Sequence, residues 1–508
     1  MKKYLILAII ATMFCGCEKS EENNSVAPFL EINKESLTFE TEGGKETVKV
    51  SSNCDWRITG GSSWCTPSNT EGNGKASIIF TTTENSATSD LKTTFYFEFE
   101  GEFGLEFAKL DVMQKAIQVD DVATLMDDAV FISYCYENFD LNKDSKISIM
   151  EANTVKAIEM STSNLISVKG IEVFTNLEKV SFSGCTSLQS IDLSKNSKVT
   201  TIGESAFEGC SSLTRVTIPD SITEIGKGAF SSCSALSSVY IADLAAWCQI
   251  NFANYSANPL SNGAHLYLSE TLVEDLVIPD GVTSIGDRAF YGCTSLTSVT
   301  IPDSVTSIGG SAFGSSTSLT SVNIGNSVTS IGDYAFRDCP SLNSVHISDL
   351  AAWCKIDFAS YSANPLSNRA HLYLNETLVK DLVIDGNTSP RISAYAFYNC
   401  TSLKSVTINV SFIESGAFCS SSLTSVTLDN NVESIGEDAF EMCRSLNEVY
   451  CKKITPPKAD YQDSYGWGAF TENHSKLKIY VPTASLNAYK EAKGWSEYRY
   501  SIVGYDFQ

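Results

Sequence analysis

The residues best suited to chemistry form one twelve-residue stretch, DLNKDSKISIME, which runs from Asp140 to Glu151. Its oxygen-bearing groups recur at the spacing that wraps a chain around a single calcium ion. Ca²⁺ is a hard cation that takes about six to eight oxygen ligands. The predicted ligands are the side chains of Asp140, Asn142 and Asp144, the carbonyl of Lys146, Ser148 through a water, and both carboxylate oxygens of Glu151.

This stretch is similar to the EF-hand loop at every position except the sixth, where Ser145 stands in place of glycine. That position needs a left-handed backbone, which costs a residue with a side chain about 1 kcal/mol. We therefore expect weakened rather than abolished calcium binding. Because the sequence holds one such loop, the ion would be structural and not part of a sensor. The open alternative is a turn rich in Asp and Asn that holds no ion.

Catalytic constellations are scarce elsewhere in the 508 residues. The chain has no nucleophile elbow, phosphate-binding loop, zinc-protease helix, dinucleotide fingerprint or paired-cysteine zinc motif. A formal net charge of −24 disfavours nucleic acid, whose phosphates attract Lys and Arg. The sequence therefore predicts a protein that is not an enzyme, binds no nucleic acid and uses no organic cofactor. The histidines are His265, His346, His371 and His474.

The N-terminus has the pattern of an exported protein. Two lysines precede an apolar run that is too short to span a bilayer and suits a signal peptide over residues 1–16. The following FCGC resembles a bacterial lipobox, which implies that Cys17 carries a lipid and that residues 17–27 form a tether. The acidic EKSEE resembles the export signal of Bacteroidetes surface lipoproteins. We expect a lipid-anchored protein on the outer membrane or cell surface; an ordinary cleaved signal peptide is the alternative.

Residues 28–117 alternate apolar and polar residues in short runs separated by turn residues, the pattern of an antiparallel, Ig-like β-sandwich. The stretch SLTFETEGGKETVKVSSNCDWRITGGSSWC and the closing LDVMQKA resemble a BACON domain. That resemblance implies a carbohydrate or mucin ligand. Trp56 and Trp64 fall within the strand alternation, so we expect core residues; stacking on a sugar ring is the alternative. Whether Cys54 and Cys65 form a disulfide stays open.

Repeats fill residues 155–450, after a segment at 118–154 that carries the calcium loop and a helix predicted through VATLMDDAVFISYCYENF. Their unit, as in VTSIGDRAFYGCTSLTSVTIPDS, recurs at a step of 23 residues. Units of this length that carry L-x-x-V-x-I predict a leucine-rich repeat solenoid with short β-strands, so the fold class is mixed. One unit buries about five apolar side chains, too few to offset its ordering entropy, so neighbouring coils must stack.

The repeat unit resembles the BspA-type leucine-rich repeat of bacterial and protist surface proteins, from about residue 155 to the end. The stretch 451–508 matches the closing unit of such proteins, which covers the last coil. The resemblance implies an adhesin, because members of that family bind host extracellular proteins such as fibronectin or fibrinogen. We therefore expect protein partners on a host or neighbouring cell. The alternative is a surface lipoprotein that captures glycan or mucin through its BACON domain.

A cysteine follows the repeat phenylalanine by three residues in most copies, and the copy with Phe313 has Ser316 in this place. A buried row that accepts Cys or Ser is a row of small side chains, and free cysteine packs well in such a place. We therefore expect these cysteines to belong to the core. They are Cys210, Cys233, Cys293, Cys339, Cys400 and Cys443.

Two segments, 243–262 and 349–368, are nearly identical, and each lies in a step lengthened from 23 to 37 residues. Asp243 and its counterpart are placed to cap a short helix, and the later AHLYL to form an added strand. Tight packing of Trp247 and Trp353 would explain the agreement. A ligand that contacts both long coils would explain it too.

The residue between Val and Ile in L-x-x-V-x-I points outward from the solenoid sheet, and these positions form the outward row. The row is rich in hydroxyl groups with Tyr and His at intervals, so it suits protein or glycan contact better than a deep small-molecule pocket. A row that is merely solvated would also favour threonine. Its members are Thr217, Tyr240, Thr300, Asn323, His346, Thr407, Thr427 and Tyr450.

Overall fold

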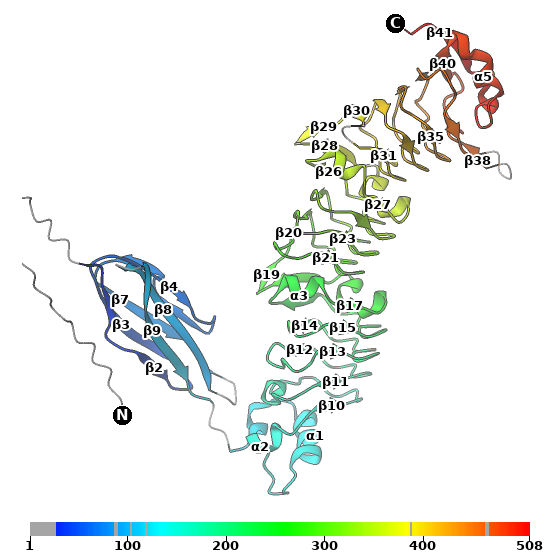
Figure 1. Ribbon diagram of the computed structural model, residues 1–508. Helices are drawn as coiled ribbons and strands as arrows, with labels where there is room; N and C mark the ends of the chain where they lie inside the picture. Colours follow the sequence, from blue (N-terminus) through cyan, green and yellow to red (C-terminus); the bar gives the residue numbers. More distant parts are fainter. Residues whose placement is uncertain are drawn as a thin grey trace, which may run out of the picture. The chain divides into compact units, whose positions relative to one another are not determined.

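A computed structural model describes residues 27–85, 90–101, 104–116, 120–386, 389–462 and 467–507. The chain divides into two compact units, Met1–Gln118 and Val119–Gln508. Both units are built largely of β-strands with few helices (Figure 1). The predicted mixed fold, a strand-rich N-terminal domain followed by a solenoid with short strands, is confirmed.

The first unit is a sandwich of two sheets. Its strands are β1 (Leu30–Ile32), β2 (Ser36–Phe39), β3 (Gly44–Ser52), β4 (Asp55–Gly60), β5 (Cys65–Pro67), β6 (Glu71–Asn73), β7 (Ala76–Thr82), β8 (Leu91–Gly101) and β9 (Gly104–Gln114). The sheets have the orders β1-β3-β7-β5 and β2-β9-β8-β4-β6. Neighbours are antiparallel except β2 and β9, which pair in parallel, so the purely antiparallel prediction is wrong at this edge. β1 belongs to the first sheet and β2 to the second, so the chain crosses between the sheets in the bend at residues 33–35.

The second unit begins with two short helices, α1 (Ala129–Phe139) and α2 (Ile149–Ala152), after a 3₁₀ turn, η1 (Val122–Leu125). The single helix predicted through this segment is therefore broken, because Asp128 caps the start of α1. One Asp128 carboxylate oxygen accepts the N–H groups of Val130 and Phe131. The other accepts those of Ile166 and Ser167, so Asp128 also ties the helix to the first coils.

Parallel strands at the V-x-I positions of the repeats form the front sheets (Figure 1). A short pair, β10 (Ala157–Glu159) and β11 (Lys179–Ser181), precedes them. The first front sheet contains β12 (Ser190–Asp192), β14 (Arg215–Thr217), β16 (Ser238–Ile241), β18 (His265–Leu268) and β19 (Thr271–Leu272). The second contains β20 (Asp275–Val277), β22 (Ser298–Thr300), β24 (Ser321–Asn323), β26 (Ser344–Ile347), β28 (His371–Leu374) and β29 (Thr377–Leu378). The third contains β30 (Asp381–Asp385), β32 (Ser405–Asn409), β34 (Ser425–Leu428), β36 (Glu448–Cys451), β40 (Lys478–Pro482) and β41 (Ile502–Tyr505).

Shorter strands of the same coils form the side sheets. They are β13 (Thr201–Ile202), β15 (Glu224–Ile225), β17 (Asn251–Phe252), β21 (Ser284–Ile285), β23 (Ser307–Ile308), β25 (Ser330–Ile331), β27 (Asp357–Phe358), β31 (Arg391–Ile392), β33 (Phe412–Ile413), β35 (Ser434–Ile435) and β37 (Lys458–Ala459). A separate pair is β38 (Tyr461–Gln462) and β39 (Trp467–Gly468). The remaining helices are α3 (Leu244–Cys248), α4 (Leu350–Trp353), α5 (Leu486–Glu491), and the 3₁₀ turns η2 (Ile171–Val173), η3 (Tyr255–Ala257), η4 (Pro259–Asn262), η5 (Tyr361–Ala363), η6 (Pro365–Asn368), η7 (Thr483–Ser485) and η8 (Ser496–Tyr498).

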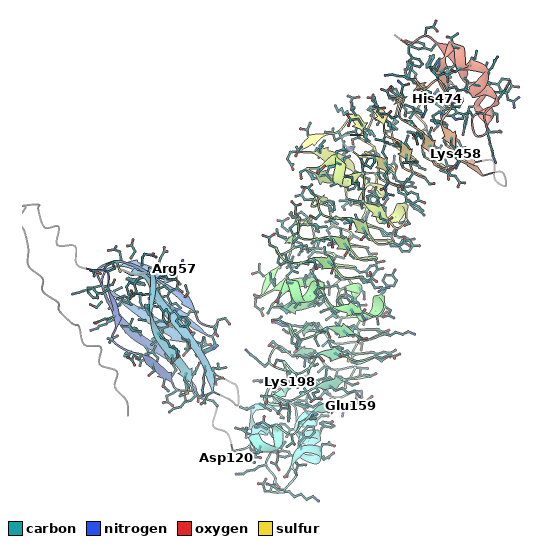
Figure 2. The ribbon with its side chains drawn as sticks, viewed as in Figure 1. Arg57, Asp120, Glu159, Lys198, Lys458 and His474 are labelled. Atoms are coloured by element: carbon teal, nitrogen blue, oxygen red, sulfur yellow. The ribbon has the colours of Figure 1, made fainter. Side chains whose placement is uncertain are left out.

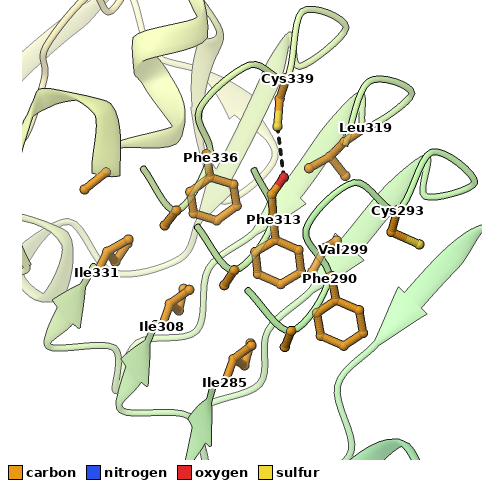
Figure 3. Packing of buried hydrophobic residues seen from close by; sticks show 14 of the residues in the cluster. Ile285, Phe290, Cys293, Val299, Ile308, Phe313, Leu319, Ile331, Phe336 and Cys339 are labelled. Carbon is orange, nitrogen blue, oxygen red and sulfur yellow. Dashed lines mark hydrogen bonds between the residues drawn. The ribbon is translucent and has the colours of Figure 1, made fainter. Parts of the chain in front are cut away.

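Equivalent apolar side chains of successive coils stack into columns inside the solenoid (Figure 3). The rings of Phe290, Phe313 and Phe336 lie with centroids 5.3 Å apart and nearly parallel planes. This separation is close to the spacing of neighbouring strands, about 4.7–4.9 Å, so each ring covers the next one. Each coil thus buries the apolar edge of its neighbour, as the repeat pattern predicts.

The cysteine row runs beside the phenylalanine column and is buried, as predicted. The Cys339 thiol donates a hydrogen bond to the Phe313 carbonyl of the preceding coil at 3.2 Å (Figure 3). The Ser316 hydroxyl donates to the Phe290 carbonyl at 3.2 Å in the same way. In these coils the position holds a small side chain that donates a hydrogen bond, a role that both Cys and Ser can fill.

Each 37-residue step consists of a lengthened coil and a hairpin. The coil spans 27 residues, counted from Ser238 in β16 to His265, its partner in β18. The hairpin accounts for the ten further residues that lead to Asp275, where the second front sheet starts. The predicted added strand in AHLYL is confirmed, because HLYL forms β18, which continues the front sheet. The structure adds a second strand, β19, which pairs with β18 antiparallel. The predicted cap is confirmed, because the Asp243 carboxylate accepts two backbone N–H groups of α3.

The C-terminal segment extends the third front sheet by β40 and β41 and covers its end with α5. Tyr489 and Trp495 are fully buried and donate hydrogen bonds to the carbonyls of Lys453 and Pro457, both at 2.8 Å. Polar side chains such as His474 project from the coils (Figure 2). No helix in the described part of the chain has the length and apolar character needed to cross a membrane.

Candidate binding surface

The outward row lies on the front sheets, at positions that alternate with buried residues. The strand register brings the eight residues together in three groups, because the front sheet is interrupted after each hairpin. The groups are Thr217 with Tyr240; Thr300 with Asn323 and His346; and Thr407 with Thr427 and Tyr450. The sequence pattern thus identifies the members of the outward row, and the structure shows that they form three separate groups.

Each group is extended by a tyrosine on the next strand. Tyr240 stacks on Tyr267, with centroids 4.6 Å apart. His346 stacks on Tyr373 at 4.7 Å, and Tyr450 stacks on Tyr480 at 4.8 Å. Residues at equal places on neighbouring strands lie at the strand spacing, so flat rings there meet face to face. Every front sheet therefore presents one stacked aromatic pair.

Tyr240 of the first pair lines a cleft of about 210 Å³ between the β18–β19 turn and the face of the first front sheet. The Arg215 guanidinium lies 3.6 Å from the centroid of the Tyr240 ring, a cation–π contact. Arg215 also forms an ion pair of 2.7 Å with Glu270 at the tip of the β18–β19 turn. We call this the hairpin cleft; Asp192, Thr217 and Asp220 also line it.

The second long coil has a corresponding arrangement of hairpin turn and front sheet, built from different residues. We call each of these two arrangements a frame. Glu376 occupies the turn of its hairpin, and its carboxylate lies 3.2 Å from Nδ1 of His346. A serine, Ser321, stands at the strand position where the first frame has Arg215. Both hairpin turns therefore carry a glutamate, but the side chain that faces the glutamate differs between them.

The sequence pattern did not identify Glu270, Glu376 or the tyrosines that stack on the outward row. They lie outside the L-x-x-V-x-I units that carry the outward row; all but Tyr480 are in HLYLSE and HLYLNE. A signal was present, because these two stretches are 106 residues apart and keep the same Tyr and Glu. Their partners across the sheet become clear only from the strand register.

The duplicated tryptophans are packed inside the solenoid. Trp247 and Trp353 are each 1% exposed. In a regular coil the phenylalanine N–H donates to the alanine carbonyl of the next coil, but the long coils lack this phenylalanine. The Trp247 indole N–H donates to the Ala289 carbonyl instead, at 2.9 Å, and the Asn258 amide donates to it at 3.2 Å. Packing therefore accounts for the agreement between the two segments.

The predicted calcium loop lies between α1 and α2, and its backbone has the expected sharp turn. Ser145 adopts φ 64°, the left-handed conformation predicted for this position. The Asp140 carboxylate accepts the N–H groups of Asp144 and Ser145 at 3.2 and 3.0 Å. Glu151 accepts the N–H groups of Leu141 and Ser148 with its two carboxylate oxygens. The loop is thus closed by its own acidic side chains.

The loop does not yet present a metal-binding geometry. Among the described residues, no three His, Cys, Asp or Glu side chains are grouped as a metal site. Hydrogen bonds, that of the Ser148 N–H foremost, hold the pKa of Glu151 below its usual value, so this carboxylate is ionised near neutral pH. The six residues of the predicted set follow one another along the loop, and convergence of their oxygens on one ion would require Glu151 to exchange some of its present contacts.

The sandwich tryptophans belong to its core rather than to an open aromatic surface. Trp56 is 4% exposed, and its indole N–H donates to the Gly74 carbonyl at 2.9 Å. Trp64 is partly buried and packs against the same core. Cys54 and Cys65 are both unpaired in the structure.

A groove of about 700 Å³ lies on the second sheet of the sandwich. Arg57 and Glu98 line it and form an ion pair of 2.8 Å, and the Arg57 side chain extends outward (Figure 2). Leu105 also lines the groove, and its neighbour Phe107 is 61% exposed. The volume is within the range of small-ligand sites, about 300–1,000 Å³.

Cys17, the predicted signal peptide and nearly all of the predicted tether lie outside the described residues. Lipid attachment therefore stays a prediction that rests on the lipobox-like sequence alone. Comparison with known proteins bears on the other parts of the chain.

Residues 133–258, 263–362 and 370–484 match the profile described as "BspA type Leucine rich repeat region", in six copies. The chain belongs to the BspA-type leucine-rich repeat family. Residues 29–104 of this BspA-type protein match the profile described as "Viral BACON domain". Both resemblances expected from the sequence are therefore confirmed.

Solved structures similar to the BspA-type chain include two leucine-rich repeat proteins. One, from Bacteroides ovatus, is 24% identical over 65% of this chain and 88% of that one, with a TM-score of 0.35. The other is a leucine-rich cell surface protein from Faecalibacterium prausnitzii, 23% identical over 61% of this chain and 87% of that one, with a TM-score of 0.33. Among curated proteins, a xyloglucan-specific endo-β-1,4-glucanase from Bacteroides ovatus is 29% identical over 91 residues. That match spans 18% of each chain, so the BspA-type protein covers less than a fifth of this relative.

Proposed function

We propose that this BspA-type protein is a non-enzymatic, adhesin-type protein that binds an extracellular protein of a host or neighbouring cell through its outward row. The observation that carries the proposal is the stacked aromatic pair on each of the three front sheets. Tyrosine is enriched among the residues that dominate binding energy at protein interfaces. Leucine-rich repeat proteins commonly bind other proteins, and repeats of this type and BACON domains are generally not enzymes.

The test is capture of fibronectin, fibrinogen and mucin by residues 27–508 on a biosensor surface. A triple variant, Tyr240→Ala with His346→Ala and Tyr450→Ala, removes one ring from each aromatic pair. Its matched control replaces three exposed tyrosines elsewhere on the solenoid, Tyr255, Tyr334 and Tyr361, by alanine. We expect binding of a host protein to weaken at least tenfold in the first variant and to persist in the control. The reverse result would place the docking surface elsewhere.

Membrane attachment through Cys17 is part of the same proposal. Its support is the apolar run followed by FCGC. Cells that express the full chain should incorporate labelled palmitate into it, and Cys17→Ala should abolish the label. Surface protease treatment of intact cells should remove the solenoid. Recovery of an unlabelled protein from the cytosol would contradict this part.

A structural calcium ion in the loop from Asp140 to Glu151 is also proposed, supported by the donor spacing and by the left-handed Ser145. Glu151→Gln keeps the capping box at the start of α2, which glutamine also forms, but removes the ligand charge. Calorimetric titration should show heat with the unaltered chain and almost none with Glu151→Gln. Absence of heat with the unaltered chain would leave the loop as an ion-free turn.

A second candidate function is glycan or mucin capture by the sandwich, which is favoured by the groove lined by Leu105 and by the exposed Phe107 two residues further along β9. Residues 27–118 would be applied to a glycan array with Phe107→Ala as the test variant. Ile79→Ala removes an exposed apolar residue on the other sheet and serves as control. Binding that Phe107→Ala alone abolishes would support this function. An array without signal, together with host-protein capture by the solenoid, would exclude it.

A further inference from the structure

One side of the hairpin cleft consists of charged and aromatic side chains that already contact one another. Arg215 lies between the Tyr240 ring and the Glu270 carboxylate. Tyr240 in turn stacks on Tyr267 at 4.6 Å with an interplanar angle of 13°. Both faces of the Tyr240 ring are therefore covered, and neither is open to stack on a sugar.

Two carboxylates of the hairpin cleft have no cationic partner among the described residues. Asp192 accepts the Ser194 N–H, and Asp220 accepts the Asp243 N–H, at 2.9 and 3.1 Å. Three carboxylates and one guanidinium line the cleft, so two negative charges are left uncompensated. The hydroxyl oxygen of Thr217, which also lines the cleft, is buried and makes no hydrogen bond within the described residues.

The size of the hairpin cleft limits what it holds. Its volume of about 210 Å³ is below the range of small-ligand sites, about 300–1,000 Å³. It suits one long side chain rather than a cofactor. A lysine or arginine stem has apolar carbons for the Tyr240 edge and a charged head for the carboxylates.

We propose that the hairpin cleft is a subsite for one basic side chain, lysine or arginine, presented by the protein partner. The proposal rests on the proposed function, since it assumes that a protein docks on the front sheets. It also assigns a role to the hairpin turn, which supplies Glu270 to hold Arg215 against Tyr240. The exposed Asp192 and Asp220 then remain for the incoming cation.

The second long coil lacks this charge arrangement. The first frame has Asp192, Thr217 and Asp220 at three positions of its front sheet and the following turn. At the same positions the second frame has Thr300, Asn323 and Asn326, respectively. Its frame keeps one carboxylate, Glu376, opposite His346. The chain should therefore hold one basic side chain in the first frame and not in the second.

The test uses the full chain and two capped tripeptides, acetyl-Gly-Arg-Gly-amide and its citrulline analogue, which has the same shape without the charge. Binding is followed by saturation-transfer NMR. The cleft variant is Asp192→Asn with Asp220→Asn, which keeps an oxygen to accept each backbone N–H. The control is Asp280→Asn with Asp303→Asn; these are exposed aspartates of the same IPD turn as Asp220, in coils without a hairpin cleft.

We expect the arginine peptide to bind saturably and the citrulline peptide not to bind. The cleft variant should weaken arginine binding at least about fivefold, and the control should leave it within about twofold. Equal weakening by both variants, or equal binding of citrulline, would overturn the subsite. A host protein captured equally by the unaltered chain and the cleft variant would also overturn it, while the proposed function would stand. Cleft-specific arginine binding without capture of any protein supports the subsite and contradicts the proposed function.

Discussion

The two long coils of the solenoid have nearly the same interior and different exteriors. Inside, Trp247 and Trp353 each donate to an alanine carbonyl of the next coil at 2.9 Å. Outside, Arg215 faces the acid of the first hairpin, whereas His346 faces that of the second. A buried donor has few acceptable replacements, because an unmatched polar group costs about 1–3 kcal/mol. A surface residue tolerates change, so the comparison separates scaffold from binding chemistry.

The strongest way to break this comparison is to remove the buried indoles. Trp247→Ala and Trp353→Ala should each lower the free energy of unfolding by about 3–5 kcal/mol, because each leaves a large cavity and removes one of the two donors to a buried carbonyl. Urea titrations followed by circular dichroism would measure both. Equal losses would confirm equal interiors. A variant that lost partner binding but kept its stability would show that the indole contacts a ligand.

The buried asparagines should have the next largest effect. Asn258 and Asn364 are fully buried, and their amides donate to the Arg288 and Tyr395 carbonyls at 2.6 and 2.7 Å. Replacement of either by alanine should destabilise the protein by about 1–3 kcal/mol, since the buried N–H of Leu260 or Leu366 loses its side-chain acceptor. The same urea titration would check this. A loss below about 0.5 kcal/mol at one site would mean that the two interiors are not equivalent.

The exteriors should differ in a smaller, salt-dependent way. Glu270 and Glu376 are largely exposed in their ion pairs, so Glu270→Ala should cost at most about 1 kcal/mol and Glu376→Ala less. The cost of Glu270→Ala should shrink at 1 M salt, where the screening length is about 3 Å. Melting temperatures at low and high salt would measure it. If Glu270→Ala and Glu376→Ala lowered stability equally and independently of salt, the two frames would not differ in their ion pairs as described.

Thiol reactivity should show the smallest difference between the coils. Burial raises the pKa of Cys248 and of Cys354 to about 12. At pH 8 only about one such thiol in ten thousand is ionised, and the thiolate is the reactive form. Both should therefore stay unlabelled in the native protein and react after unfolding, as peptide mapping would show. Cys54, which is partly exposed, should be labelled first among the described cysteines.

Local patterns in the sequence determined the fold class, the repeat step, the buried cysteine row and the left-handed turn at Ser145. These features depend on residues close together in the chain, whose periods and turn chemistry identify an element without its neighbours. The pattern also favoured packing for the duplicated tryptophans, and their burial agrees with it.

Only the tertiary structure decided which side chains meet. It broke the predicted helix at Asp128, placed β2 parallel to β9 and divided the outward row into three groups. It also brought Glu270 to Arg215 across 55 residues of sequence. The physical reason is that strand register and hairpin length set these contacts, and both arise from packing between coils rather than from the residues of any one coil.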